Sequence, residues 1–386
     1  MNLRKVVEAL IPHGILEFAK KNITINVLNY VRNKYKKMVV QENSVLVIEL
    51  TGVHGENLPS LAKYLLDLHY NVDILLKKPE KKENNRNDLG LFACFNDDNR
   101  LKIRVLSGMD INLLLRSAAI TLYRHVVVGS FCDRMKRNHF YRVDLFKLKP
   151  ICMIHNPDTV NNDYFKTNKI ISLVKMNCIN REPPCVISCH YFGDFPRKEK
   201  SKKTVFATLN TKDLSRRNLY LLFSACDNLY KKNISNFTVK IIGNGLKIPE
   251  RFRDNFYVFG FLDFQKMYKE IETADFFLAL IDQASIKYTN KASGSYGLSY
   301  GFIKPIILHR KFSSVSSFND ENSVLYDDNN DLSDAMEKCI NISNDRYQSL
   351  VFSLENSGKE LYNTSLCNFK EVLETPIRYV SYDKIL

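Results

Sequence analysis

Long hydrophobic runs are missing from this 386-residue sequence. No stretch approaches the roughly 20 consecutive apolar residues that a membrane-spanning helix needs. The N-terminal stretch MNLRKVVEALIPHGILEF carries Glu8, Pro12 and His13 inside its apolar part, which makes a poor secretory signal. Hydrophobic residues still make up 45% of the chain and charged residues 25%, which is a globular composition. We therefore expect a cytoplasmic protein whose length suits two α/β domains.

The sequence also lacks a recognisable metal motif. Its nine cysteines are scattered and odd in number, and Cys185 and Cys189 with His190 form the one close set. No second pair stands at metal-ligand spacing. The acidic clusters at 97–98 and 327–331 do not follow an apolar strand as a metal-binding Asp-x-Asp would. We expect free thiols in a reducing compartment, no metal and no tightly bound cofactor.

The net charge of +14 is confined to one half of the chain. Residues 1–203 hold 34 Lys/Arg against 20 Asp/Glu, whereas residues 204–386 hold 22 of each. Such an asymmetry predicts an anionic partner for the N-terminal half, and nucleic acid and an anionic lipid surface are the two candidates. The basic segments 77–86 and 134–149 show no zinc, helix-turn-helix or stacking signature. This favours an anionic membrane surface over nucleic acid.

Residues 1–43 are predicted to form basic amphipathic helices. They contain eight Lys/Arg and three Glu, with apolar residues such as Ile11, Ile15 and Phe18 between them. A basic amphipathic helix can lie in a membrane interface. The alternative is a helix that packs on the following domain, and both interpretations stay open. The first predicts peripheral attachment to the inner face of the cytoplasmic membrane.

The next segment opens an α/β domain. The strand 44–50 is followed by a glycine-containing loop, by a helix with apolar residues at helical spacing over 58–66, and by a strand at 72–76. This order is the start of a doubly wound parallel sheet, and Asn57 is a plausible helix cap. A helix is expected over 111–122, and further strands at 101–106, 125–128, 150–154, 168–174 and 185–188.

The same rhythm restarts after residues 196–203, which have the composition of a linker. Strands are expected at 204–209, 237–242, 257–259, 276–281 and 305–308, and helices at 216–229, 264–273, 331–342 and 346–361. We predict two Rossmann-like domains that face a cleft, over 44–195 and 204–360. The tail 361–386 follows, and its return to the N-terminal domain is an open possibility.

Small residues between 292 and 305 (ASGSYGLSYGFIKP) predict a phosphate site. Ser293, Gly294 and Ser295 stand just before a helix, where hydroxyls and backbone N–H groups can hold an anion, although an ordinary helix cap would look the same. Arg216 and Arg217 follow the first strand of this domain, where ligands bind. Two adjacent helical arginines cannot face one point, so one of them is expected to bind. Neighbouring loops contribute further candidates: Gly243, Asn244, Gly245, Tyr288 and Lys291.

Several stretches together resemble glycosyltransferases of the GT-B fold from bacterial surface-polysaccharide clusters. They are TGVHGENLPSLAKYLLDLHYNVDILL, SRRNLYLLFSACDNL, VKIIGNG, FGFLDFQKMYKEIETADFFLALI and SGSYGLSYGFIKPII, within about residues 44–345. The resemblance implies a metal-independent hexosyltransferase that binds a nucleotide-sugar, most commonly UDP-linked, on its C-terminal domain. It implies a glycan or lipid-linked acceptor on the N-terminal domain.

One feature of the retaining members of that family is missing, the E-x7-E pair. The matching positions here are Asn290 and Leu298, which favours inversion slightly. His54 lies in the first βα loop, where inverting enzymes often place the base that removes the acceptor proton, and Glu56 is near enough to orient or replace it. His155 follows the strand 150–154 and is similar to a strand-end histidine near the donor sugar. For each of these residues a purely structural role is the alternative.

Three other functions compete with sugar transfer. A nucleotide-sugar epimerase of the same fold would need several carboxylates in the cleft. A nucleic-acid-binding protein would account for the pI of 9.2. A dinucleotide oxidoreductase would need a G-x-G-x-x-G after a first strand, and the sequence has none there.

Overall fold

The computed structural model describes residues 40–50, 54–78, 88–95, 98–116, 118–131, 149–155, 169–175, 185–210, 217–243, 247–285, 287–289 and 291–375. The predicted helices of 1–43, apart from residues 40–43, lie outside these ranges. So do the site candidates Arg216, Asn244 and Gly245.

The N-terminal domain is built on a seven-stranded parallel sheet with the order β3-β2-β1-β4-β5-β6-β7. Its strands are β1 (Ser44–Glu49), β2 (Asn71–Lys77), β3 (Leu101–Leu106), β4 (His125–Phe131), β5 (Ile151–Ile154), β6 (Lys169–Ser172) and β7 (Cys185–Val186). Its helices are α3 (Leu58–Asp67) and α4 (Gly108–Arg116), with short 3₁₀ turns η1 (Gly55–Asn57), η2 (Asp88–Phe95) and η3 (Ala118–Leu122). β1 is buried along its whole length, with apolar side chains at positions 45–48, because layers cover both faces of a parallel sheet.

The C-terminal domain has a six-stranded parallel sheet with the order β10-β9-β8-β11-β12-β13. Its strands are β8 (Thr204–Asn210), β9 (Phe237–Gly243), β10 (Phe256–Phe259), β11 (Phe276–Leu278), β12 (Ile306–His309) and β13 (Ser323–Tyr326). Its helices are α7 (Leu219–Lys231), α8 (Phe264–Glu272), α9 (Gly294–Gly301) and α10 (Leu332–Asn341), with 3₁₀ turns at Glu250–Phe252, Lys287–Thr289, Arg310–Ser316 and Asn329–Asp331. The two sheets confirm the predicted pair of Rossmann-like domains, which is the GT-B arrangement.

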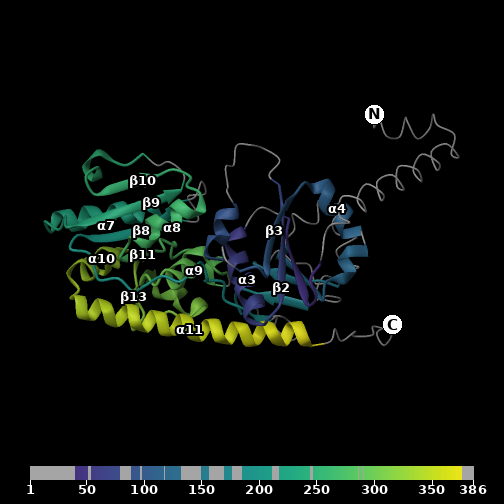
Figure 1. The fold of residues 1–386 in the computed structure, drawn as a ribbon. Coiled ribbons are helices and arrows are strands. Elements are labelled where there is room, and N and C mark those ends of the chain that lie inside the picture. The colour runs from purple at the N-terminus through teal and green to yellow at the C-terminus, as the bar shows by residue number, and fades with distance from the viewer. Residues whose placement is uncertain are drawn as a thin grey trace, which may run out of the picture.

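A single long helix, α11 (Asn344–Glu374), runs along both domains (Figure 1). Its first half packs on the C-terminal domain, where the Tyr347 hydroxyl donates to the Asp275 carbonyl at 3.2 Å. Its second half reaches β6 and β7, where Asn368 Nδ2 donates to the Val186 carbonyl at 2.8 Å. Tyr362 also donates to Asp67 of α3 at 2.6 Å. The helix therefore ties the two domains together.

Some predicted boundaries were wrong. The last helix was expected to end near 361 but continues to Glu374, because the N-terminal domain supplies a second surface that buries Phe369 and Leu373. The helix expected over 216–229 begins only at Leu219, because the Asn218 side chain caps it by accepting from Leu221 N at 3.0 Å. The strand expected at 276–281 stops at Leu278. The helix expected over 111–122 is divided into α4 and η3.

Close packing of α9 against the chain that enters the second domain gives a first prediction. A Cβ at Gly301 would lie 2.3 Å from the carbonyl oxygen of His190, and one at Gly297 would lie 2.6 Å from that of Cys189. Backbone cannot move away cheaply, so Gly301→Ala should destabilise the protein by about 1–3 kcal/mol. Urea unfolding measures this. Gly260→Ala is the matched control, because nothing lies within 4 Å of its added methyl group, and an equal loss in both variants would contradict the packing argument.

Candidate active site between the two domains

The cavity that carries the site lies between the two domains and encloses about 780 Å³ of empty space that is open to solvent. Loops at the carboxyl ends of β1, β5, β8 and β11 bring residues to it, as expected for open parallel sheets. The described residues that line it are His54, Glu56, Asn57, His155, Leu173, Ser188, Cys189, Arg217, Tyr288, Lys291, Ala292, Ser293, Gly294, Tyr296, Gly297, Tyr300 and Ser316.

A histidine and a carboxylate form one wall of the cavity. His54 Nδ1 lies 3.2 Å from Glu56 Oε1, and both side chains are about one-third exposed, at 32% and 34%. Burial would raise the pKa of Glu56, but the hydrogen bond with His54 and the charge of His54 lower it overall. An ionised Glu56 accepts a hydrogen bond from Nδ1–H of His54, so the lone pair of a neutral His54 is on Nε2. This is the arrangement of a general base with its orienting carboxylate.

The backbone of His54 is itself unusual. Its φ of 76° and ψ of 24° place it in the left-handed region, which residues with a Cβ adopt at a cost. The Asn57 N–H donates to the His54 carbonyl at 3.1 Å and closes the short turn η1. The turn therefore presents the imidazole at a fixed place just before α3.

His155 packs against the ring of His54. The two rings stack with centroids 4.3 Å apart and an interplanar angle of 13°. His155 is 7% exposed, and burial, followed by the neighbouring His54, lowers its pKa to about 4. Its Nε2 lies 3.0 Å from the Gly129 carbonyl and 3.1 Å from Ser130 Oγ, and its Nδ1 lies 3.3 Å from Asn57 Nδ2. His155 is therefore neutral at physiological pH.

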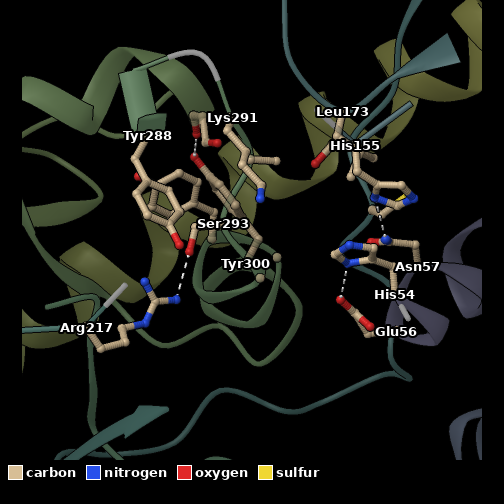
Figure 2. Close-up of a pocket in the computed structure, with 17 residues that line it drawn as sticks. His54, Glu56, Asn57, His155, Leu173, Arg217, Tyr288, Lys291, Ser293 and Tyr300 are labelled. Atoms are coloured by element: carbon tan, nitrogen blue, oxygen red, sulfur yellow. Dashed lines mark hydrogen bonds and ion pairs between the residues drawn. The ribbon is translucent and has the colours of Figure 1, made fainter. Parts of the chain in front are cut away.

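The opposite wall belongs to the C-terminal domain and carries positive charge. Arg217 is 6% exposed, and its Nη2 donates to Ser293 Oγ at 3.0 Å and to Ser295 Oγ at 2.8 Å. The guanidinium lies 5.9 Å from the Tyr288 ring centroid. Figure 2 shows Lys291 reaching into the space between the walls. Two cations on one side of a cavity suit an anionic ligand.

The N-terminus of α9 adds to this positive wall. Ser293 caps the helix by accepting from Ser295 N at 3.3 Å. A Cβ at Gly294 would meet nothing within 4 Å, so the space in front of the first turn is open. Helix N-termini bind phosphate through backbone N–H groups and the helix dipole. The arrangement can hold a diphosphate between α9, Arg217 and Lys291.

The structure brings most of the predicted site residues together. His54, Glu56 and His155 line the cavity, as do Arg217, Tyr288, Lys291, Ser293 and Gly294, and Ser295 contacts Arg217 behind it. Gly243 does not line it. Its φ of 131° and the 2.1 Å that would separate its Cβ from the Asn210 carbonyl give it a backbone role at the end of β9. The premise that Arg217 is a helical residue was wrong, because it precedes the cap of α7.

Sequence reasoning missed two functional candidates. Asn57 was expected to cap α3, but its side chain makes no cap hydrogen bond and turns to His155 instead. Tyr296 lines the cavity with a buried hydroxyl that has no hydrogen-bond partner among the described residues. The segment SGSYGLSYG contained a signal for Tyr296, because the residue stands in the first turn of the predicted phosphate-binding helix.

Within the described ranges, no group of three or more His, Cys, Asp or Glu residues could hold a metal ion. Among the cavity-lining residues that the structure describes, Glu56 is the one carboxylate. His190 is 7% exposed, its Nε2 donates to the Gly358 carbonyl at 3.0 Å, and its Nδ1 lies 2.9 Å from Ser188 Oγ. It is an interior residue behind the cavity.

No protein-family model and no curated protein sequence matches the chain. Solved structures do resemble it. A TarM variant from S. aureus in complex with UDP and alpha-GlcNAc-glycerol is 10% identical, with a TM-score of 0.59 over 86% of this chain and all of that one. A glycosyltransferase from Rickettsia africae is 12% identical, with a TM-score of 0.55 over 87% of this chain and all of that one. An alpha-glucosyltransferase with UDP and a 13-mer DNA is 10% identical, with a TM-score of 0.52 over 87% of this chain and all of that one. At these identities the likeness establishes the fold.

Proposed function

We propose that this protein is a glycosyltransferase that transfers a hexosyl group from a nucleoside diphosphate sugar to an acceptor hydroxyl with inversion. The observation that carries the proposal is a histidine–carboxylate pair that faces two cations and a helix N-terminus across one cavity. His54, oriented by Glu56, lines the same cavity as Arg217, Lys291 and the N-terminus of α9. Sugar transfer needs a base that removes the acceptor proton and, on the other side of the sugar, positive groups that stabilise the departing diphosphate.

The positions of these groups define the role of each in the proposed reaction. His54 Nε2 takes the proton of the acceptor hydroxyl, whose oxygen attacks the anomeric carbon of the donor. The bond between that carbon and the diphosphate oxygen breaks, and its electron pair leaves with the diphosphate. Arg217, Lys291 and the backbone N–H groups at Ser293–Ser295 stabilise the charge that develops there. Because attack and departure occur on opposite faces of the sugar, the product is inverted.

The donor is proposed to carry UDP. The S. aureus TarM variant and the alpha-glucosyltransferase, which share this fold, were both solved with UDP. An epimerase is less well supported, because Glu56 is the one carboxylate among the described residues that line the cavity. We retain a role in bacterial surface-polysaccharide synthesis, with a glycan or lipid-linked acceptor, as part of the proposal.

Transfer and its stereochemistry test the proposal together. The purified protein, given UDP-sugars and a panel of glycan and lipid-linked acceptors, should release UDP and form a product whose anomeric configuration is opposite to that of the donor. NMR of the product reads the configuration. The reaction should proceed at an unchanged rate with EDTA, because the cations of the site are Arg217 and Lys291. Retention of configuration would contradict His54 as the base, and rescue by a divalent ion would contradict a metal-independent site.

Attachment to the membrane is a second part of the proposal. The N-terminal half carries the whole net charge, and each Lys or Arg near an anionic leaflet contributes about 1 kcal/mol. No helix within the described residues is long and apolar enough to cross a bilayer.

We expect the protein to sediment with anionic vesicles at low salt and to be released at high salt, while neutral vesicles leave it in solution. Removal of residues 1–43 should weaken the binding. A 13-mer DNA duplex serves as a competing anion. Indifference to anionic vesicles at low salt, or stronger binding to the duplex, would contradict membrane attachment.

A further inference from the structure

The hydrogen bonds of His155 determine which of its nitrogens carries the proton. Nε2 lies 3.0 Å from the Gly129 carbonyl, which can only accept, so Nε2 is the donor. Nδ1 then holds the lone pair and accepts from Asn57 Nδ2 at 3.3 Å. This tautomer is assigned from the hydrogen-bond partners of the two ring nitrogens. Both ring nitrogens are occupied by protein, so His155 has none left for a substrate.

His155 contacts His54 through the face of its ring. It covers one face of His54 at a centroid distance of 4.3 Å and nearly parallel. Glu56 engages the Nδ1 edge of His54 at 3.2 Å. One face and one edge of His54 are therefore fixed by neighbours. Nε2 is the remaining polar atom of the ring.

We propose that Asn57 and His155 are positioning residues that hold His54 in the orientation and tautomer required of the base. This inference rests on the proposed function. Asn57 locks the His155 ring through Nδ1, and the ring in turn supports His54. When His54 takes a proton, its imidazolium stacks on an uncharged ring. A second positive charge at His155 would oppose that step.

The surroundings support a neutral His155. Burial lowers its pKa to about 4, so it remains uncharged while His54 gains and loses a proton. The titratable groups that face the pair come from several elements. Glu56 in η1 and Lys291 act on the pair itself. Cys189 and Tyr268 of α8 act on Glu56, and Glu49 of β1 lies beside Gly129, whose carbonyl is bonded to His155. Lys291 favours a neutral His155 further, because a cation nearby opposes its protonation.

Asn57 is the residue that distinguishes this arrangement from ordinary packing. As the N-cap position of α3 it could have served the helix, but its side chain makes no cap hydrogen bond. It is 7% exposed, and its amide is directed at His155. If Asn57 served only to stabilise the helix, its side chain would accept a hydrogen bond from a backbone N–H of the first turn of α3.

The test combines kinetics with NMR of ¹⁵N-histidine-labelled protein. Asn57→Leu and His155→Ala should each lower kcat about 10–100-fold, by analogy with the loss of hydrogen-bond partners that orient metal-ligating histidines. The affinity for UDP, measured by calorimetry, should change by less than about twofold, because neither residue binds the donor. Long-range ¹H–¹⁵N spectra should show His54 as the Nδ1–H tautomer in the wild type and a mixture of tautomers in both variants.

His190→Ala is the matched control. His190 is as buried as His155, and its nitrogens are engaged in the same manner, by Gly358 and Ser188, but it does not stack on His54. This variant should lower the Tm and leave the His54 resonances unchanged. Full kcat in His155→Ala would overturn the proposal. Unchanged His54 resonances in Asn57→Leu would also overturn it. The spectra need no substrate, so a wild type that transfers no sugar overturns the proposed function alone.

Discussion

His54→Asn should lower kcat for sugar transfer by about 10²–10⁴-fold, the usual contribution of a general base. Asparagine suits this position because it tolerates the left-handed backbone, here at φ 76°, better than alanine does. The variant therefore removes the imidazole without adding backbone strain. UDP affinity should be retained, because His54 lies on the wall opposite the anion site. Steady-state kinetics and calorimetry measure the two quantities separately.

His69→Asn is the control for this substitution. His69 also has a left-handed backbone, at φ 62°, but it is exposed at the end of α3. Its replacement should leave kcat unchanged. Glu56→Gln should cost less than His54→Asn, since a glutamine oxygen can still accept from Nδ1 although it lacks the charge. Full turnover in His54→Asn would remove His54 as the base.

Twelve of the thirteen strands that the structure describes could be predicted from sequence, because they are short segments rich in β-branched and apolar residues between polar loops. β13 (Ser323–Tyr326) was missed, and the acidic cluster 327–331 was therefore wrongly said to follow no apolar strand. β3, at Leu101–Leu106, matches its predicted bounds. The error at α11 has a physical cause. Beyond Leu361 its buried positions, among them Ser365, Phe369 and Leu373, face a different domain from its first half. A single sequence does not show that second surface.

The site could be predicted in its parts but not in its geometry. Loops at the carboxyl ends of parallel strands were correct places to search, because such ends share one edge of a sheet. His54 and His155 are far apart in sequence, and their stacking depends on how β1, β4 and β5 align. The role of Asn57 depends on the same alignment. The preference of asparagine for N-cap positions predicted a hydrogen bond to α3, whereas the side chain is oriented by its tertiary contact with His155.

For Arg216 and Arg217 too, the sequence predicted the kind of residue at the site but not the backbone that positions it. A helix from residue 216 would have directed them to different sides. Instead α7 begins at Leu219, and Arg217 lies in the preceding loop, where its side chain turns inward to Ser293 and Ser295. The cap at Asn218 was the signal that could have placed the helix start correctly.

Arg217→Ala should weaken UDP binding by about 10–150-fold, which corresponds to the roughly 1.5–3 kcal/mol of a hydrogen bond to a charged group. The guanidinium is buried and already oriented by two serine hydroxyls, so little entropy is lost when it binds a diphosphate. Arg217→Lys should recover only part of the loss, because an ammonium keeps the charge but not the planar fork.

Arg251→Ala, which breaks an exposed pair with Asp227, is the control and should bind UDP as the wild type does. Calorimetry with UDP, GDP and CMP gives the affinities and the base preference in one series. Wild-type affinity in Arg217→Ala would exclude it from the donor site, and the same measurement on Arg216→Ala would then show whether the neighbouring arginine binds instead.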